Sequence, residues 1–113
     1  LATILGILTI ARATKNKDIA KIEPFASFER ANSVDPARVP GPLLIAQSGK
    51  DTIVAAAVTR KFAKAVCRRG TPTRWIDLTG DHGASAKDSA QETIGWITSR
   101  FDGNPPPNDC RRI

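Results

Sequence analysis

The chain has 113 residues, 41% of them apolar and 25% charged, and these ordinary values for a globular protein exclude a mostly disordered chain. Its net charge is +6, from 17 Lys and Arg against 11 Asp and Glu. The basic residues are scattered and do not alternate with aromatic ones, as they do in proteins that bind single-stranded nucleic acid. We therefore expect solvated basic faces, no nucleic-acid partner, and at most peripheral contact with a membrane.

The first region, residues 1–40, begins with a strongly apolar run over residues 1–10. As a helix this run is too short to cross the roughly 30 Å core of a bilayer, and no basic segment precedes it as in a signal peptide. We interpret it as a helix that is buried or faces a partner. Because the sequence contains no Met and begins with Leu1, we expect that processing, proteolysis or truncation set this end.

The remainder of the first region is expected to be partly helical up to about residue 32. A connector follows over residues 33–42, and its prolines favour an extended backbone because each disfavours helix at the residue before it. These prolines are Pro36, Pro40 and Pro42. The second region, residues 41–113, carries a cleaner pattern of alternating strands and helices.

The apolar run at residues 43–47 predicts a strand that is buried on both faces. A helix is predicted over residues 55–69, with an apolar stripe that recurs every fourth residue. This stripe consists of Val58, Phe62 and Val66. Gly70 and Pro72 are typical of residues that follow the end of a helix.

A second strand is predicted over residues 73–78, and a last helix from Ser85 or Ser89 to Phe101. Ser89 and Glu92 have the spacing of a helix-capping box. The apolar stripe of this helix is Ala90, Ile94, Ile97 and Phe101. Because two strands joined through a helix are parallel in a right-handed unit, their carboxyl ends are expected at one edge of the sheet.

Two side chains with complementary chemistry follow these strands. Asp51 lies in the turn after the first strand, and His82, the only His, lies in the loop after the second. A catalytic His needs a carboxylate that fixes its tautomer and stabilises the imidazolium formed during turnover. Gly80 and Gly83 would let the loop bend and let substrate approach. The pattern alone is also compatible with a turn or cap residue at Asp51 and a surface histidine at position 82.

The two cysteines, Cys67 and Cys110, cannot form a tetrahedral zinc site with a single His. They form either a disulfide or two independent thiols. A disulfide would close a long loop, stabilise the fold by roughly 4 kcal/mol and tie down the Pro-rich tail. It would also indicate an oxidising compartment.

A series of short motifs runs in order through the second region. The first strand leads to Gly49-Lys50-Asp51-Thr52-Ile53-Val54, and the first helix ends in Cys67-Arg68-Arg69-Gly70. The next loop ends in His82-Gly83, and the last helix ends in Trp96-Ile97-Thr98-Ser99-Arg100-Phe101, before Gly103, three prolines and Cys110. In this order the motifs resemble the C-terminal end of α/β-hydrolases, in particular the secretory lipase family.

The resemblance implies the C-terminal part of an α/β-hydrolase fold, with parallel strands and flanking helices, preceded by a partly helical segment derived from the cap over the active site. It implies that Asp51 is the acid and His82 the general base of a Ser-Asp-His triad, and that Cys67 and Cys110 are bridged. The expected activity is hydrolysis of an ester or lipid substrate, with no metal or organic cofactor, in a secreted or periplasmic protein.

The sequence departs from the family pattern in two places. Ala55 stands where the family often has Pro, which softens the start of the helix. More seriously, no Ser of the sequence lies in a Gly-x-Ser-x-Gly nucleophile elbow. We therefore expect this chain alone to be inactive and to need a missing N-terminal portion or a homo-oligomeric partner. Two alternatives remain: one chain of a nicked two-chain hydrolase, and a non-catalytic basic binding module.

Overall fold

The computed structural model describes residue 15 and residues 18–113, and the chain divides into two units, Leu1–Val34 and Asp35–Ile113. In the first unit a 3-10 helix η1 (Ile19–Lys21) precedes helix α2 (Phe25–Asn32), in line with the partly helical character expected there. The apolar helix expected over residues 1–10 lies outside the described residues. The cap-like role of the first region therefore stays a prediction.

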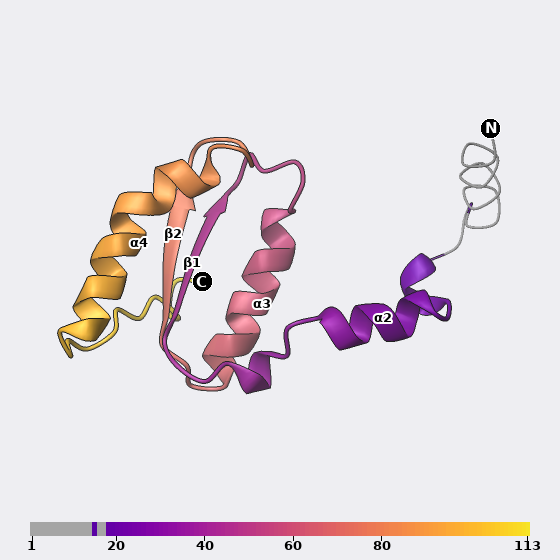
Figure 1. Ribbon diagram of the computed structural model, residues 1–113, viewed down its shortest axis with the longest axis horizontal. Coiled ribbons are helices and arrows are strands. Elements are labelled where there is room, and N and C mark those ends of the chain that lie inside the picture. The colour runs from indigo at the N-terminus through magenta and orange to yellow at the C-terminus, as the bar shows by residue number, and fades with distance from the viewer. Residues whose placement is uncertain (1–14, 16–17) are drawn as a thin grey trace. The chain divides into compact units, whose positions relative to one another are not determined.

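In the second unit two parallel strands, β1 (Leu43–Ser48) and β2 (Thr73–Leu78), pair along their full length. Helix α3 (Ala56–Arg68) connects them, and helix α4 (Ser85–Phe101) follows β2. Figure 1 shows α3 and α4 on opposite sides of the sheet. The predicted α/β architecture, with parallel strands and flanking helices, is confirmed at this level. No helix in the described part of the chain is long and apolar enough to span a membrane.

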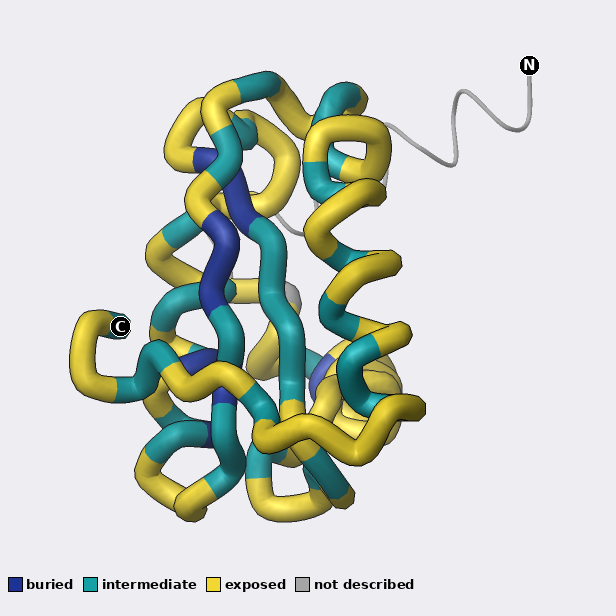
Figure 2. The backbone as a smooth tube through the Cα atoms, turned by 90° about the vertical axis from the view of Figure 1, so that its left-hand side faces the viewer, coloured by how far each residue is buried: buried dark blue, intermediate teal, exposed yellow. Residues whose placement is uncertain are grey.

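The core of this unit lies on the strands and on the inner face of α3. Its apolar members are Ala63, Val66, Trp75 and Ile76, and Figure 2 shows buried residues concentrated along the two strands. The prediction that β1 is buried on both faces is wrong, because only its last two residues, Gln47 and Ser48, are buried. A sheet of two strands, the extent seen in the described residues, is too narrow to enclose β1.

The apolar stripe predicted for α3 is only partly correct. Val66 is fully buried, and Ala63, which sits three residues before it on the same face, is buried as well. Val58 is 66% exposed, so the stripe does not continue into the first turn of the helix. The inner face of α3 is therefore set by its C-terminal half, and small residues contribute as much to it as large ones.

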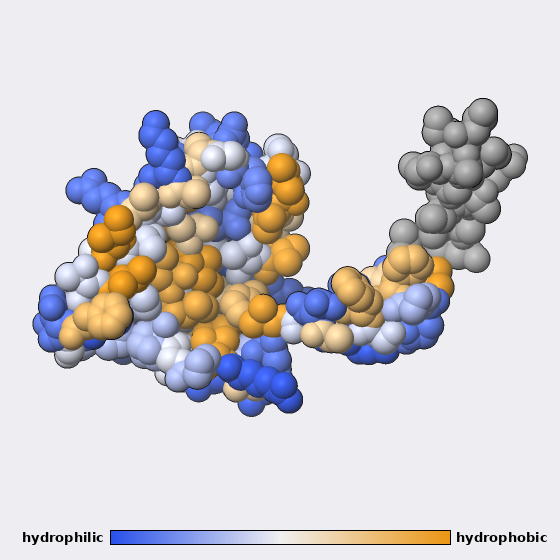
Figure 3. Space-filling model, viewed as in Figure 1, coloured by the Kyte–Doolittle hydropathy of each residue, from blue (hydrophilic) through white to orange (hydrophobic). Residues whose placement is uncertain are grey.

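Helix α4 departs further from the sequence prediction. Ile94, Ile97 and Phe101 of its apolar stripe are 64%, 44% and 89% exposed. The capping box is also wrong: the helix begins earlier, at Ser85, and the hydroxyl of Ser89 donates to the carbonyl of Ser85 inside the helix. In Figure 3 apolar side chains gather between α3 and α4, where Figure 1 draws β1.

The C-terminal tail covers the outer edge of β2. The backbone N–H of Asp109 donates to the carbonyl of Thr73 (2.7 Å), and the N–H of Trp75 donates to Oδ2 of Asp109 (2.9 Å). A disulfide between Cys67 and Cys110, whose Cα atoms are 5.5 Å apart, ties the tail to the end of α3. The cysteine pattern alone allowed either a disulfide or two free thiols, and the structure contains the disulfide.

The connector before β1 is less extended than predicted. Its first proline, Pro36, starts a 3-10 helix η2 (Pro36–Arg38), and the carboxylate of Asp35 accepts a hydrogen bond from the N–H of Ala37 (2.9 Å). Proline at the first helical position does not disrupt a helix, because the missing N–H is one that a helix start leaves unused. The rule applied to the connector therefore missed this turn.

Candidate active site

The carboxyl ends of β1 and β2 lie at the same edge of the sheet, and the loop after each strand supplies one of the two side chains predicted for catalysis. Oδ2 of Asp51 lies 2.8 Å from Nδ1 of His82. The Asp51 side chain is only 5% exposed, whereas that of His82 is 45% exposed. The structure therefore brings the acid and the imidazole together, with the acid protected and the ring open to approach.

The other oxygen of Asp51 is held by the backbone of its own turn. Oδ1 accepts hydrogen bonds from the N–H of Ile53 (2.9 Å) and of Val54 (2.8 Å). The bond from Val54, followed by the one from His82, lowers the pKa of Asp51 to about 2. The carboxyl group is therefore ionised at neutral pH.

An ionised Asp51 determines which nitrogen of His82 carries the proton. A carboxylate can only accept hydrogen bonds, so the contact at Nδ1 requires an N–H on that atom. In the neutral imidazole the other nitrogen, Nε2, then has its lone pair free to take a proton. The pair thus has the protonation pattern of a general base with a carboxylate behind it.

Two buried polar residues at the end of β1 support this pair, and neither was predicted from the sequence to contribute to the site. The amide of Gln47 donates to the carbonyl of Val54 (3.3 Å), within the Asp51 turn. The hydroxyl of Ser48 donates to the carbonyl of Gly80, in the loop that carries His82. The sequence signal that could have identified these two residues is their position, since they are polar residues at the end of an otherwise apolar strand.

Glycine at position 80 has a different reason from the predicted one. A Cβ at Gly80 would lie 2.6 Å from Oδ2 of Asp88 and 2.8 Å from Cβ of Ala84, so the close approach of α4 requires the absence of a side chain. At Gly83 a Cβ would meet nothing closer than 3.5 Å, so this position does not require glycine for space. The packing of α4 against the loop, rather than a sharp bend, accounts for Gly80.

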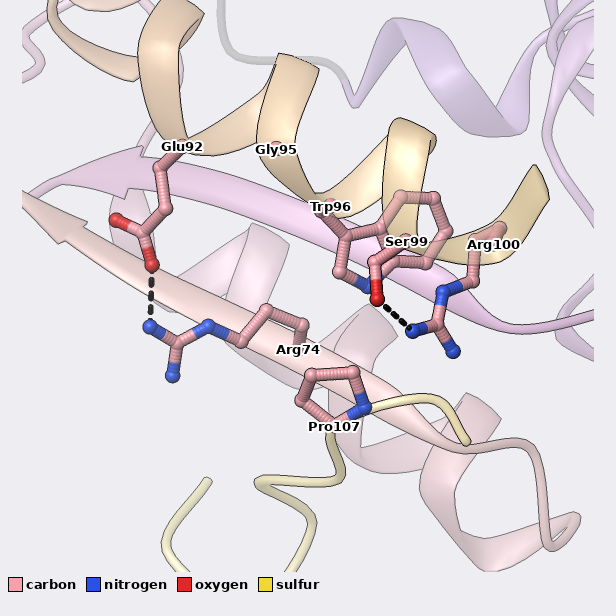
Figure 4. A pocket seen from close by; sticks show the side chains of 7 residues that line it. All are labelled: Arg74, Glu92, Gly95, Trp96, Ser99, Arg100 and Pro107. Atoms are coloured by element: carbon pink, nitrogen blue, oxygen red, sulfur yellow. Dashed lines mark hydrogen bonds and ion pairs between the residues drawn. The ribbon is translucent and has the colours of Figure 1, made fainter. Parts of the chain in front are cut away.

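A separate hollow of about 380 Å³ lies between α4, β2 and the tail. Its lining includes Arg74, Glu92, Trp96 and Arg100, and Figure 4 shows Arg74 paired with Glu92 and Arg100 with Ser99. No residue of the acid turn or of the His82 loop lines it. Arg74 is paired with Glu92, whereas Arg100 contacts only the hydroxyl of Ser99, and its buried Nε and Nη1 have no partner among the described residues. Because the hollow holds neither Asp51 nor His82, we do not assign the predicted chemistry to it.

The fold and the site together define an α/β protein with an Asp–His pair in hydrogen-bonding contact at the carboxyl edge of a parallel sheet. The chain belongs to the secretory lipase family, whose family model matches residues 7–109. No curated protein and no solved structure matches the chain significantly. The family match confirms the resemblance seen in the motifs and extends it into the first region. It implies a hydrolase of lipase or esterase type and suggests secretion.

Proposed function

We propose that this chain supplies the acid, Asp51, and the general base, His82, of a serine ester hydrolase. The observation that carries the proposal is the 2.8 Å contact between Oδ2 of Asp51 and Nδ1 of His82, at the edge of a parallel sheet where such folds bind ligands. Membership of the secretory lipase family supports ester hydrolysis as the reaction.

In the proposed reaction, Nε2 of His82 takes the proton from a serine hydroxyl as that oxygen attacks the ester carbonyl. Asp51 holds the ring in place and stabilises the imidazolium that forms. His82 then returns the proton to the leaving alcohol, and later activates the water that hydrolyses the acyl-enzyme. These steps need no cofactor.

We propose that the nucleophilic serine lies on a segment outside these 113 residues, because no serine of the sequence lies in a Gly-x-Ser-x-Gly elbow. Ser48, the serine nearest to the acid turn, does not fit this role. Its side chain is fully buried, and its hydroxyl is bonded to the carbonyl of Gly80 and to the N–H of Lys50.

Two features support the attachment of that segment along β1. The tail already covers the outer edge of β2, whereas β1 has only one neighbouring strand among the described residues. The exposed apolar residues Ile94 and Ile97 of α4 would be covered by a wider sheet. A further parallel strand beside β1 would satisfy both requirements, as in the sheet of a complete α/β-hydrolase.

The test is turnover of p-nitrophenyl butyrate by the longest gene product that contains these residues. We expect His82→Ala to lower kcat by roughly 10⁴-fold or more, and Asp51→Asn by roughly 10⁴-fold, as when triad members are removed elsewhere. Asp102→Asn, on an exposed carboxylate after α4, is the matched control and should leave kcat unchanged. Full activity of the His82→Ala protein would refute the proposal.

The 113-residue chain by itself should show no turnover, because it carries neither the nucleophile nor the donors that stabilise the oxyanion. An intact mass of the purified sample distinguishes the alternative of a nicked enzyme, since a second chain would then be present. Turnover by the pure chain that disappears in His82→Ala would contradict the location proposed for the serine.

A further inference from the structure

The side chain of Gln47 connects three segments near the proposed active site. It is 6% exposed and lies at the end of β1, on the side of α3. Its Nε2 donates to the carbonyl of Ser48 (3.0 Å) and to that of Val54 (3.3 Å), and also lies 3.5 Å from Oδ2 of Asp51. The hydroxyl of Thr59, on α3, donates to its Oε1 (2.6 Å).

These contacts allow only one orientation of the amide. The carbonyls of Ser48 and Val54 can only accept, so the nitrogen must face them, and the oxygen then faces Thr59. Both amide protons and the amide oxygen have partners, which is the condition for burying such a group without a large cost in stability. The amide therefore acts as a fixed strut between α3 and the turn that begins at Asp51.

The next residue, Ser48, faces the opposite side of the sheet and connects the two loops. It is fully buried, its hydroxyl donates to the carbonyl of Gly80, and it accepts from the N–H of Lys50 (3.0 Å). Lys50 directly precedes Asp51, and Gly80 lies two residues before His82. One hydroxyl thus joins the acid turn to the loop that carries the imidazole.

We propose that Gln47 and Ser48, the last two residues of β1, are positioning residues that hold Asp51 and His82 in hydrogen-bonding contact. Gln47 fixes the turn that presents the carboxylate, and Ser48 fixes the distance between this turn and the His82 loop. The catalytic consequence depends on the function proposed above, but the positioning itself does not.

The geometry explains why two residues are needed. Asp51 sits in a turn whose backbone N–H groups bind its own Oδ1, which sets the carboxylate relative to the turn but not relative to His82. The loop that carries Asp51 follows β1, and the loop that carries His82 follows β2, so the two loops could shift relative to each other. A misplacement of about 1 Å is enough to impair a catalytic contact. Gln47 anchors one loop to α3, and Ser48 anchors the loops to each other.

The experiment measures the tautomer of His82 by two-bond ¹H–¹⁵N spectra of the whole chain, above the pH range in which histidine usually titrates. In the wild-type chain we expect the Nδ1–H form, because Asp51 accepts from that nitrogen. Gln47→Leu, which removes the donor and the acceptor at similar size, should shift the population towards the Nε2–H form. Ser48→Ala should act in the same direction.

Thr59 provides a milder and graded test. Thr59→Val keeps the shape of the side chain but removes the donor to Gln47, so it should shift the tautomer population in the same direction by a smaller amount. Thr59→Ser restores the hydroxyl and should restore the wild-type spectrum. This pair keeps the proposal testable even if Gln47→Leu fails to fold.

Val66→Ala is the matched control, because Val66 is fully buried on the same helix but takes part in none of these hydrogen bonds. It should lower the midpoint of thermal unfolding and leave the tautomer unchanged. A wild-type spectrum in folded Gln47→Leu, Ser48→Ala and Thr59→Val chains would overturn the inference. The measurement needs no turnover, so its outcome is independent of the esterase test.

Discussion

The two oxygens of Asp51 have separate tasks. Oδ1 closes the turn by accepting hydrogen bonds from the backbone N–H groups of Ile53 and Val54. Oδ2 accepts a hydrogen bond from Nδ1 of His82. The hydrogen bonds that close the turn do not involve the imidazole. The carboxylate is therefore preorganised for its contact with His82. An asparagine at this position would keep one acceptor for the turn but lose the charge.

The lowered pKa of Asp51 predicts how the stability of the chain depends on pH. An ordinary Asp titrates at about 3.9 in an unfolded chain, and Asp51 at about 2 in the fold, so its stabilising contribution is complete above the first value and is lost as the pH falls through the second. The difference in the free energy of unfolding between the wild-type chain and Asp51→Asn should therefore shrink below about pH 4.

Urea denaturation from pH 7 to pH 2 would check this expectation. Asp109 also has a lowered pKa, caused first by its bond from Arg112, but it is present in both proteins and cancels in the difference. A difference that stays constant over the whole pH range would mean that the charge of Asp51 does not stabilise the fold.

At the level of elements, the C-terminal tail acts as a substitute for a strand beside β2. Asp109 is its main contact: the 16% exposed carboxylate accepts from the N–H of Trp75, from Arg74 and from Arg112, each at 2.9 Å. The guanidinium of Arg112 also donates to the carbonyl of Trp75 (3.0 Å). The tail therefore pairs with the backbone of β2 through both side chain and main chain.

We predict that Asp109→Ala destabilises the chain by about 1.5–3 kcal/mol, because it leaves the buried backbone N–H of Trp75 without its acceptor and removes one acceptor from each of two guanidinium groups. The free energy of unfolding from urea titration is the measurement. Asp102→Ala, which removes an exposed carboxylate after α4, should change it by less than about 0.5 kcal/mol. Equal effects of the two substitutions would show that the tail contact does not contribute to stability.

The elements were largely predictable from the sequence, and their faces were not. Periodicity and turn residues placed both strands and helix α3 of the second unit to within a residue or two, and they placed the end of α4 but left its start between Ser85 and Ser89. The apolar stripe of α4 was predicted, but its exposure to solvent was not. A hydrophobic pattern indicates that a helix face is suited to burial, but it does not indicate which polypeptide covers that face. Ile94 and Phe101 therefore point to solvent in this chain.

The candidate site was predictable to a similar depth. The loop positions of Asp51 and His82 follow from strand order alone, since parallel strands end at one edge. Gln47, Ser48 and Thr59 could not be found in this way, because their role depends on which groups the fold brings within about 3 Å of them. Gly80 was selected, but the reason is its packing against Ala84, which no local pattern contains.

For the whole molecule, the edge of β1 that has no neighbouring strand among residues 18–113 predicts self-association when no further strand is supplied. The N–H of Leu43 donates towards β2, so by alternation the backbone groups of Leu44 and Ala46 point to the open edge. We expect a concentration-dependent dimer in sedimentation velocity experiments. Ala46→Pro, which removes one outward N–H, should favour the monomer.

Ile45→Pro is the matched control, because its N–H points towards β2, and it should disrupt the β1–β2 pairing and unfold the chain. Circular dichroism would separate loss of structure from loss of association. A wild-type chain that sediments as a compact monomer at high concentration would show that the edge of β1 is not available for pairing.

The covering of β2 by the tail also limits how many copies can join. A sheet with two free borders can add molecules without end and grow into a fibre, whereas one with a single free border is used up after one encounter. The few residues around Asp109 that occupy one border therefore prevent further molecules from adding to the sheet on that side. If they were detached, we would expect paired molecules to give way to open-ended aggregates.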